Sequence, residues 1–403
     1  MAAAQLTWLD LTAADRDKVR QVLTLFSEQG TVDELGLGSL RDMLSNTLFP
    51  GLSVLHTRLR YVLFIPWIYQ QVEALGPDHD PAQAGREREL QLIEALAASD
   101  DKRGIIGIMA RQSLSRLAST AYWALIAHLG IFVPGYSQGW YHTHFDRLVR
   151  KRGDVPRADD PGVIWSQQPT WHPRLPAVAA KFPAEASFTL TYDEADFIRG
   201  RIEERCAGTL LEWLVREGSP GLHESLWEEP ILDSLPQTIA HQVELARRFS
   251  LHVEGAPLLY NLLLAEARHR LQPSDDDQAL VAKYHARIAG WADLESAEAP
   301  FETIVLWEQT ARAGMRVVSQ QQHFVDTWTR RVAQVGPHAI ADDPALRQLI
   351  TVRERRLKGE HRARLANPGR LLDWSGDVGT GRMVFRWPQA RQMLIDLHCG
   401  LER

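Results

Sequence analysis

A run of basic residues near the carboxyl end holds the side chains best suited to binding an anionic partner. Residues 347–391 contain eleven basic side chains against four acidic ones, a local excess of about +7. Because the whole chain has a formal net charge of −6, the remaining residues carry about −13. Such an asymmetry is typical of a basic region that faces a polyanion. The side chains expected to meet phosphates are Arg353, Arg355, Arg356, Lys358, Arg362 and Arg364.

The kind of basic residue also favours phosphate. Ten of the eleven basic side chains are arginines, and arginine suits bidentate contacts with phosphate. Five or more such contacts would make binding strongly dependent on salt. The alternative is a solvated helix face whose charges are balanced by acids elsewhere in the fold. Trp374 and Trp387 lie beside these basic side chains in the sequence, where an indole could stack on a base, although core packing is the commoner fate of tryptophan.

A second, smaller basic cluster lies beside an apolar stretch in the N-terminal half. Arg58 and Arg60 are two positions apart, so they cannot share one face of a helix. One of them could reach a ligand while the other pairs with a carboxylate such as Asp33, Glu34 or Asp42. The alternative is that both form buried ion pairs that link the N-terminal helices.

Signals for metal binding and catalysis are weak, and we expect no metal and no cofactor. His142 and His144 would lie on one side of a strand, but no cysteine or acid stands at a diagnostic spacing. Asp275–Asp277 lacks the alternating ligands of a calcium loop. The glycine-rich segment 376–381 is not followed by the lysine of a phosphate-binding loop. An enzyme is therefore the less favoured interpretation, and a nuclease assembled from scattered acids such as Glu354 stays open.

Composition places the chain among soluble globular proteins. The 403 residues are 45% hydrophobic and 24% charged, close to the globular average. Two cysteines are too few for a disulfide framework and suit a reducing cytoplasm. The first ten residues show no signal peptide. The most apolar run, Tyr61–Tyr69, is far shorter than the roughly 20 residues of a membrane span, so we expect a cytoplasmic protein that is not inserted in a membrane.

Helical patterns dominate and must position these side chains, so the expected fold is mainly α and multi-helical. Apolar residues recur every three or four positions in several segments. We expect helices over residues 13–29, 37–48, 52–66, 193–216 and 237–249. Pro66 is expected to end or kink one helix and Pro257 to restart the chain in another. Residues 78–89 are polar and proline-containing and are expected to form an exposed connection.

The longest helix is predicted over residues 301–335. Apolar residues step by three and four from Ile304 to Val335, with Gln322 as the exception. At 1.5 Å per residue this helix would be about 50 Å long. It could therefore act as a spine for the second half of the chain.

Two places depart from simple helical patterns. Residues 104–148 contain a turn-rich break, which fits an embedded winged-helix-like module and equally fits two ordinary helices. Ser187–Thr191 and Arg382–Trp387 alternate briefly, so either could be an edge strand, and we expect a small β element near the C-terminus.

We expect four consecutive regions along the chain. They are an N-terminal helical domain over 1–100, a helical or winged-helix-like module with a Pro/Trp-rich loop over 101–175, a central helical domain over 176–340, and a basic C-terminal region over 341–403.

Several stretches carry a family resemblance. They are Gly30–Asp42 with Asp-Glu-Leu-Gly-x-Gly, Leu48–Tyr61 with Phe-Pro-Gly-x-Ser and Thr-Arg-x-Arg-Tyr leading into Phe64–Trp67, His252–Glu266, and Arg353–Gly359. Together they resemble a bacterial family catalogued as a domain of unknown function, over nearly the whole chain. The resemblance implies a place in phage-defence gene clusters beside helicases and phospholipase-D-like nucleases, and it supplies no catalytic residue.

The expected function is therefore a non-catalytic subunit of a bacterial anti-phage defence complex. It would bind DNA without sequence preference, or it would act as a scaffold for a helicase or nuclease subunit. Because a Phe-Pro-Gly turn precedes Arg58 and Arg60, these two join the C-terminal set as nucleic-acid contacts. The alternative is a metal-dependent nuclease with an unrecognised active site.

Overall fold

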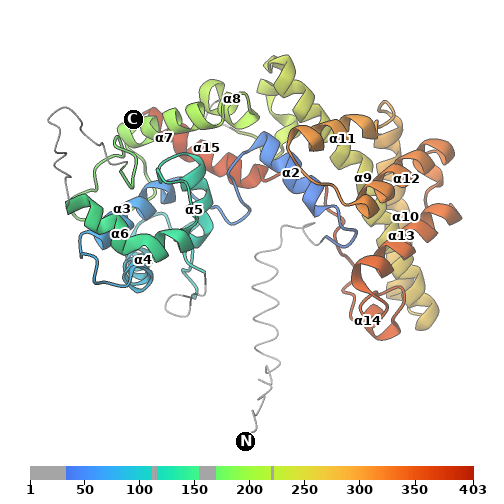
Figure 1. Ribbon diagram of the computed structural model, residues 1–403. Helices are drawn as coiled ribbons and strands as arrows, with labels where there is room; N and C mark the ends of the chain where they lie inside the picture. The colour runs from blue at the N-terminus through green and yellow to red at the C-terminus, as the bar shows by residue number, and fades with distance from the viewer. Residues whose placement is uncertain (1–32, 111–113, 115, 154–168, 219–221) are drawn as a thin grey trace, which may run out of the picture. The chain divides into compact units, whose positions relative to one another are not determined.

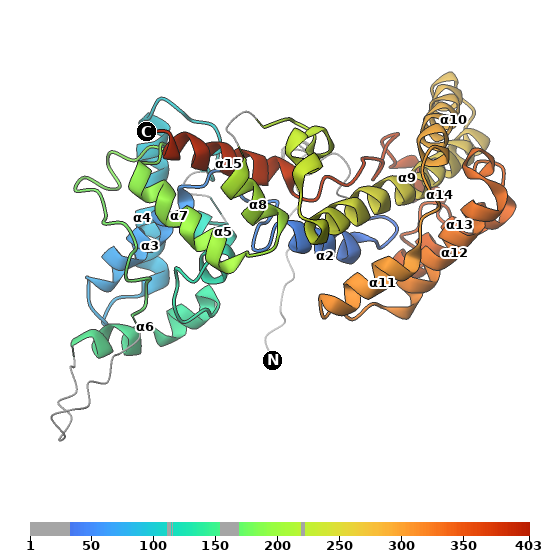
Figure 2. The same ribbon diagram turned by 90° about the horizontal axis from the view of Figure 1, so that it is seen from above.

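The computed structural model describes residues 33–110, 114, 116–153, 169–218 and 222–403. Nearly all regular structure in these residues is α-helical, and the mainly α fold expected from the sequence is confirmed. One isolated bridge joins Phe132 and Trp171. The described part of the chain falls into two compact units (Figures 1 and 2). Unit 1 contains residues 33–43 and Leu245–Met383, and unit 2 contains Leu44–Glu244 and Val384–Arg403.

Unit 2 is a cluster of helices around an aromatic core. Its helices are α3 (Tyr61–Glu73), α4 (Pro81–Ala98), α5 (Ala118–His128), α6 (Gln138–Gly153), α7 (Tyr192–Arg205), α8 (Leu210–Glu217) and α15 (Trp387–Leu401), with 3-10 turns η2 (Leu226–Glu228) and η3 (Pro230–Ser234). Both views show α15 running beside α7 and α8, which it contacts (Figures 1 and 2). Helix α3 is buried on nearly every side, so its apolar run belongs to a core helix.

Unit 1 is built on most of the long helix α9 (Gln237–Leu271). Around it lie the start of α2 (Gly38–Leu48), α10 (Asp275–Ser296), α11 (Thr303–Arg312), α12 (Ser319–Val335), the turn η4 (Pro337–Ala339), α13 (Pro344–Lys358) and α14 (Pro368–Leu372). His252 on α9 joins three of these helices, because its ring nitrogens lie 2.7 Å from Glu295 Oε1 on α10 and 2.9 Å from Thr329 Oγ1 on α12.

The longest helix is α9, with 35 residues, rather than the segment 301–335. That segment divides into α11 and α12, because Gly314 between them has φ +65°, a conformation that glycine adopts without strain. Helix α9 in turn runs through Pro257, where a restart was expected. A proline removes one helical hydrogen bond, but the fully buried neighbours Leu258 and Leu259 hold this stretch in place by packing.

Other helices begin or end at residues that differ from the predicted ones. Helix α2 confirms the prediction over 37–48, whereas the helix predicted over 52–66 begins only at Tyr61 and continues through Pro66. The segment 193–216 divides into α7 and α8 beside Gly208, whose φ is +75°.

The prediction of an exposed connection over residues 78–89 is wrong, because helix α4 begins at Pro81. The Asp80 carboxylate accepts the Ala82 N–H at 2.9 Å, and Pro81 occupies the first helical position. An acidic N-cap followed by proline is a strong start signal for a helix.

The finer β and winged-helix expectations are not confirmed. Where residues 104–148 are described they form α5 and α6, which fits two ordinary helices. Residues 187–191 and 382–386 form no strand, and Phe385 and Arg386 instead take positive φ values of 49° and 65° before α15. The helix predicted over 13–29 lies outside the described residues. No helix in the described ranges combines the length and the apolar character that crossing a membrane requires.

Candidate polyanion-binding site at the end of α13

Three stretches that are distant in the sequence meet at the C-terminal end of α13, within unit 1. Lys358, in the last turn of α13, donates hydrogen bonds to Glu34, to Tyr260 Oη on α9 (3.0 Å) and to Glu354 (3.0 Å). Arg364, in the loop that follows, also pairs with Glu34, at 2.9 Å. Each stretch belongs to one of the motifs quoted above, so the motifs converge on one buried cluster.

Glu354 organises the loop after α13. It is completely buried, and it accepts the Tyr260 hydroxyl, the Arg364 N–H at 2.8 Å and the Leu365 N–H at 3.0 Å. Burial opposes its ionisation, but these hydrogen bonds and the Lys358 ammonium hold the pKa of Glu354 below its ordinary value. The loop backbone is therefore fixed to a buried carboxylate.

Arg353 is an internal side chain rather than a surface contact. It is 6% exposed, and its guanidinium donates to the carbonyl oxygens of Leu35 (2.8 Å) and Gln320 (3.1 Å) while lying over the Phe324 ring. Burial lowers its pKa. Arg353 thus fastens α13 to the chain before α2, and reaching a phosphate would require it to leave these acceptors.

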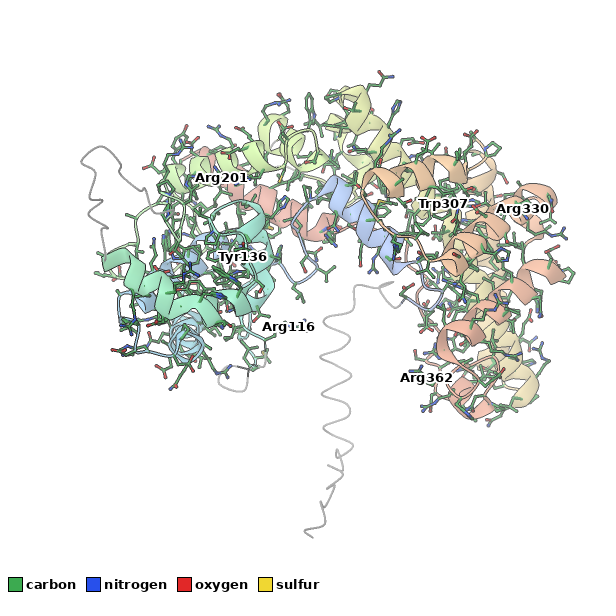
Figure 3. All side chains as sticks on the ribbon, viewed as in Figure 1. Arg116, Tyr136, Arg201, Trp307, Arg330 and Arg362 are labelled. Atoms are coloured by element: carbon green, nitrogen blue, oxygen red, sulfur yellow. The ribbon has the colours of Figure 1, made fainter. Side chains whose placement is uncertain are left out.

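Three arginines remain at the surface, and we call Arg355, Arg356 and Arg362 the α13-end arginines. Arg355 is 48% exposed on its side chain and pairs at 3.1 Å with the exposed Glu360. Arg362 uses Nε to bond the Lys358 carbonyl oxygen at 3.0 Å. Within the described ranges no carboxylate pairs with Arg356 or Arg362, and both are exposed. Figure 3 shows Arg362 on the rim of unit 1.

The comparisons with known proteins identify a family. A family of unknown function (DUF6361) matches residues 3–399. The chain belongs to this family. Neither a curated protein nor a solved structure matches it. Membership of DUF6361 confirms the resemblance as far as an uncharacterised family is concerned, and the gene-cluster setting stays a prediction.

The second basic cluster of this DUF6361 member is internal to unit 2. Arg58 pairs with Asp396 at 3.0 Å and with Asp101 at 2.5 Å, and Arg60 pairs with Glu194 at 2.7 Å. These contacts follow the alternative in which both arginines form buried ion pairs. Their partners come from α15, α7 and the chain after α4, not from the N-terminal acids considered from the sequence.

The two tryptophans of the basic region are core residues. Trp374 is 3% exposed and Trp387 is 1% exposed. An indole buried to this extent has no face available to a base. Both tryptophans therefore pack in the core and do not stack on nucleic acid.

The weak metal and nucleotide signals also find structural explanations. The described residues contain no group of three or more His, Cys, Asp and Glu placed to hold a metal ion. His142 and His144 lie on α6, a helix rather than a strand. In the glycine-rich loop 376–381, Tyr284 and Arg287 of α10 donate to backbone carbonyl oxygens at 2.7 and 2.9 Å, so the loop is held by α10.

Sequence reasoning missed a partly exposed row of aromatic rings at the start of α6. Its members are Tyr136, Trp140 and His144, four residues apart. That spacing was the available signal, but interpreting this stretch as a turn and a strand concealed it, because residues four apart lie about 13 Å from each other along a strand and become neighbours only on a helix.

Proposed function

We propose that the protein is a non-catalytic helical subunit that holds nucleic acid by its phosphates, through the α13-end arginines. The main support is that the basic side chains of one cluster fall into two groups, one paired with carboxylates and the other, in the described ranges, left without them. Lys358 and Arg364 are tied to Glu34 and the buried Glu354, whereas Arg356 and Arg362 extend from the same rigid segment with no carboxylate partner among the described residues.

Physical chemistry favours phosphate as the ligand of these three side chains. Arginine is less strongly hydrated than lysine and can donate two parallel hydrogen bonds to a phosphate. Arg355 and Arg356 stand in the last turn of α13, where the helix dipole also stabilises positive charge. Contacts with phosphates carry no sequence information, which leads us to propose binding without sequence preference.

The setting we propose comes from the family resemblance. The protein would act in the bacterial cytoplasm, within an anti-phage defence complex that contains a helicase or nuclease subunit. Scaffolding of such a subunit is the neighbouring possibility, and it would show as co-purification that survives high salt and nuclease digestion.

A nuclease centred on Glu354 and Lys358 has less support. The Glu354 carboxylate already accepts hydrogen bonds from Tyr260 and from two backbone N–H groups. The Lys358 ammonium is shared between two carboxylates. Neither side chain is available to hold a metal ion or to activate a water molecule.

The test compares two double charge reversals of equal size by fluorescence anisotropy with a labelled DNA duplex. Arg356→Glu/Arg362→Glu alters the proposed site. Arg316→Glu/Arg330→Glu alters two other exposed arginines of unit 1 that also lack an acidic partner in the described residues. Figure 3 shows Arg330 and Arg362 well separated in unit 1. The control keeps the change in net charge the same.

The slope of log affinity against log salt concentration supplies the readout. Losing two phosphate contacts should reduce the magnitude of that slope by about 2, and only the first variant should show the loss. If both variants reduce the slope by the same amount, the loss reflects net charge alone, and the proposed site is rejected.

A further inference from the structure

The aromatic row beside α6 forms a continuous stack. The ring centroids of Tyr136 and Trp140 are 4.4 Å apart with an interplanar angle of 31°, and those of Trp140 and His144 are 4.3 Å apart with an angle of 16°. A spacing of four places side chains above one another on a helix. Trp140 and His144 therefore lie one turn apart on one side of α6, and Tyr136, which precedes the helix, continues the stack beyond its first turn.

This row is part of the surface. Tyr136, at one end of the stack, is 55% exposed, and Trp140 and His144 are half-buried. Behind them lie Phe132 and Tyr141, which are fully buried in the aromatic core of unit 2. Scattered exposed aromatic residues need no explanation, but a stack of three that ends in an exposed ring offers a planar ligand a place to continue it.

Hydrogen bonds to neighbouring residues hold the three rings in place. Trp123 Nε1 donates to the Tyr136 carbonyl oxygen at 3.0 Å, and Ser137 Oγ accepts the Trp140 N–H at 3.2 Å at the start of α6. His144 Nδ1 lies 2.9 Å from the Trp140 carbonyl oxygen. A ligand that stacks here would not have to order the rings first, which favours binding.

Exposed arginines lie on α6 near the row. Residues 147–150 of α6 include Arg147 and Arg150 and contain no acid. Arg150 pairs with Asp146, whereas Arg147 is exposed and no carboxylate in the described ranges pairs with it. Arg147 follows His144 by three positions, so it extends the same face of the helix. Arg116 is a further exposed arginine, and Figure 3 places it in the same part of unit 2 as Tyr136.

We infer that this row binds unpaired bases of single-stranded nucleic acid. A base would stack on the exposed Tyr136 ring, and Arg147 and Arg116 would meet the backbone phosphates. Every base has a planar face, so such stacking tolerates any sequence. In a duplex those faces are covered by neighbouring bases, so the row favours single strands. This site lies on other residues than the α13-end arginines and adds recognition of bases to contact with phosphates.

Charge complementarity selects this occupant over a proline-rich peptide. Aromatic grooves also bind polyproline segments, but such peptides carry no charge that would use Arg147 and Arg116. A polyanion with planar groups uses both the rings and the arginines.

The experiment measures anisotropy of two labelled strands of twenty nucleotides, an oligothymidylate and a strand whose sites are mostly abasic. Tyr136→Ala should weaken binding of oligothymidylate by about 5-fold or more and should leave binding of the abasic strand unchanged. Tyr136→Phe keeps the ring and should bind both strands as the wild type does. The matched control is Tyr192→Ala, which removes a tyrosine of unit 2 that is 49% exposed and belongs to no ring stack in the described residues.

Several results would overturn the inference. They are equal oligothymidylate binding by the Tyr136→Ala and Tyr192→Ala variants, no preference of the wild type for oligothymidylate over the abasic strand, and tighter binding of a proline-rich peptide than of oligothymidylate. The proposed function fails separately. If Arg356→Glu/Arg362→Glu leaves binding of both strands unchanged while the effect of Tyr136→Ala persists, the α13 site is rejected and the α6 row stands.

Discussion

The Nε atom of Arg58 lies 3.1 and 3.0 Å from the two carboxylate oxygens of Asp396, although the residues are 338 positions apart in the chain. Asp396 also accepts the Leu59 N–H at 2.9 Å. Burial raises the pKa of Asp396, while Arg58 and the Leu59 N–H act in the opposite direction. The pair therefore joins helix α15 to the residues just before α3 inside unit 2.

Removing one partner of this pair should be costly. Arg58→Ala leaves the Asp396 carboxylate buried without its guanidinium, and we expect a loss of about 3–5 kcal/mol in the free energy of unfolding. The double variant Arg58→Ala/Asp396→Ala should lose less than the sum of the single variants, because the stranded charge is gone. Urea unfolding of the four proteins measures the coupling, and additive losses would contradict the role of the pair.

A histidine near this pair should make stability fall in acid. The ring of His56 is satisfied only when neutral, because Nδ1 accepts the Ser53 N–H at 3.2 Å and Nε2 donates to the Ala121 carbonyl oxygen at 3.0 Å. A proton on Nδ1 would face another donor. Burial lowers the pKa of His56 to about 4, whereas the unfolded chain takes up the proton near 6.5.

The unfolded state therefore binds more protons between these pKa values, and stability is lost as the pH falls from about 6.5 toward 4. The full effect, reached below pH 4, is about 3.5 kcal/mol at roughly 1.4 kcal/mol for each pKa unit. His56→Gln should flatten this part of the stability profile. NMR titration supplies a direct check, since a His56 resonance that titrates near 6.5 in the folded protein would refute the assignment.

Local sequence signals located individual helices better than they located breaks. Helix α2 was found because its apolar positions repeat regularly. The structure adds a contact at its start, where the Asp33 carboxylate accepts the Leu37 N–H at 2.6 Å. The segment 301–335 keeps the same apolar repeat across Gly314, so the pattern could not show that the helix stops there. At Pro257 the error is reversed, because tertiary packing carries the helix through a residue that usually interrupts one.

The candidate site shows the same limit for charges. Counting side chains located the basic region but not the partner of each one. Lys358 and Glu34 are 324 positions apart, and their pairing exists only in the folded chain. The aromatic row on α6 was accessible to sequence reasoning, since Tyr136, Trp140 and His144 already stand four apart, but it required the correct helix assignment.

A buried acid of unit 2 should have the opposite pH dependence to His56. Glu89 accepts the Ser119 N–H at 2.9 Å through Oε2, while its Oε1 is buried with no hydrogen-bond partner among the described residues. Burial raises the pKa of Glu89 to about 7. The folded protein then keeps a proton that the unfolded chain releases near 4.5, so stability is lost as the pH rises from about 4.5 through 7.

Glu89→Gln removes this ionisation while keeping an oxygen that can accept the Ser119 N–H. We expect it to raise the free energy of unfolding at pH 8 by up to about 3 kcal/mol and to change it little at pH 4.5. Thermal unfolding of both proteins at the two pH values measures the difference. Equal stability of variant and wild type at pH 8 would show that Glu89 ionises without cost.

The last prediction separates folding from binding within the α13 cluster. Lys358 shares its ammonium between Glu34 and the buried Glu354, so Lys358→Ala should lower the free energy of unfolding by about 2–4 kcal/mol. Because Lys358 has these partners, the same variant should keep the salt dependence of DNA binding, measured below its unfolding transition. Arg356→Ala should do the reverse, lowering the magnitude of the slope by about 1 with stability within about 0.5 kcal/mol of the wild type. If Lys358→Ala reduces the slope as much as Arg356→Ala does, the Lys358 ammonium must leave its carboxylates to meet phosphate. The assignment of Lys358 to folding and of Arg356 to binding would then be wrong.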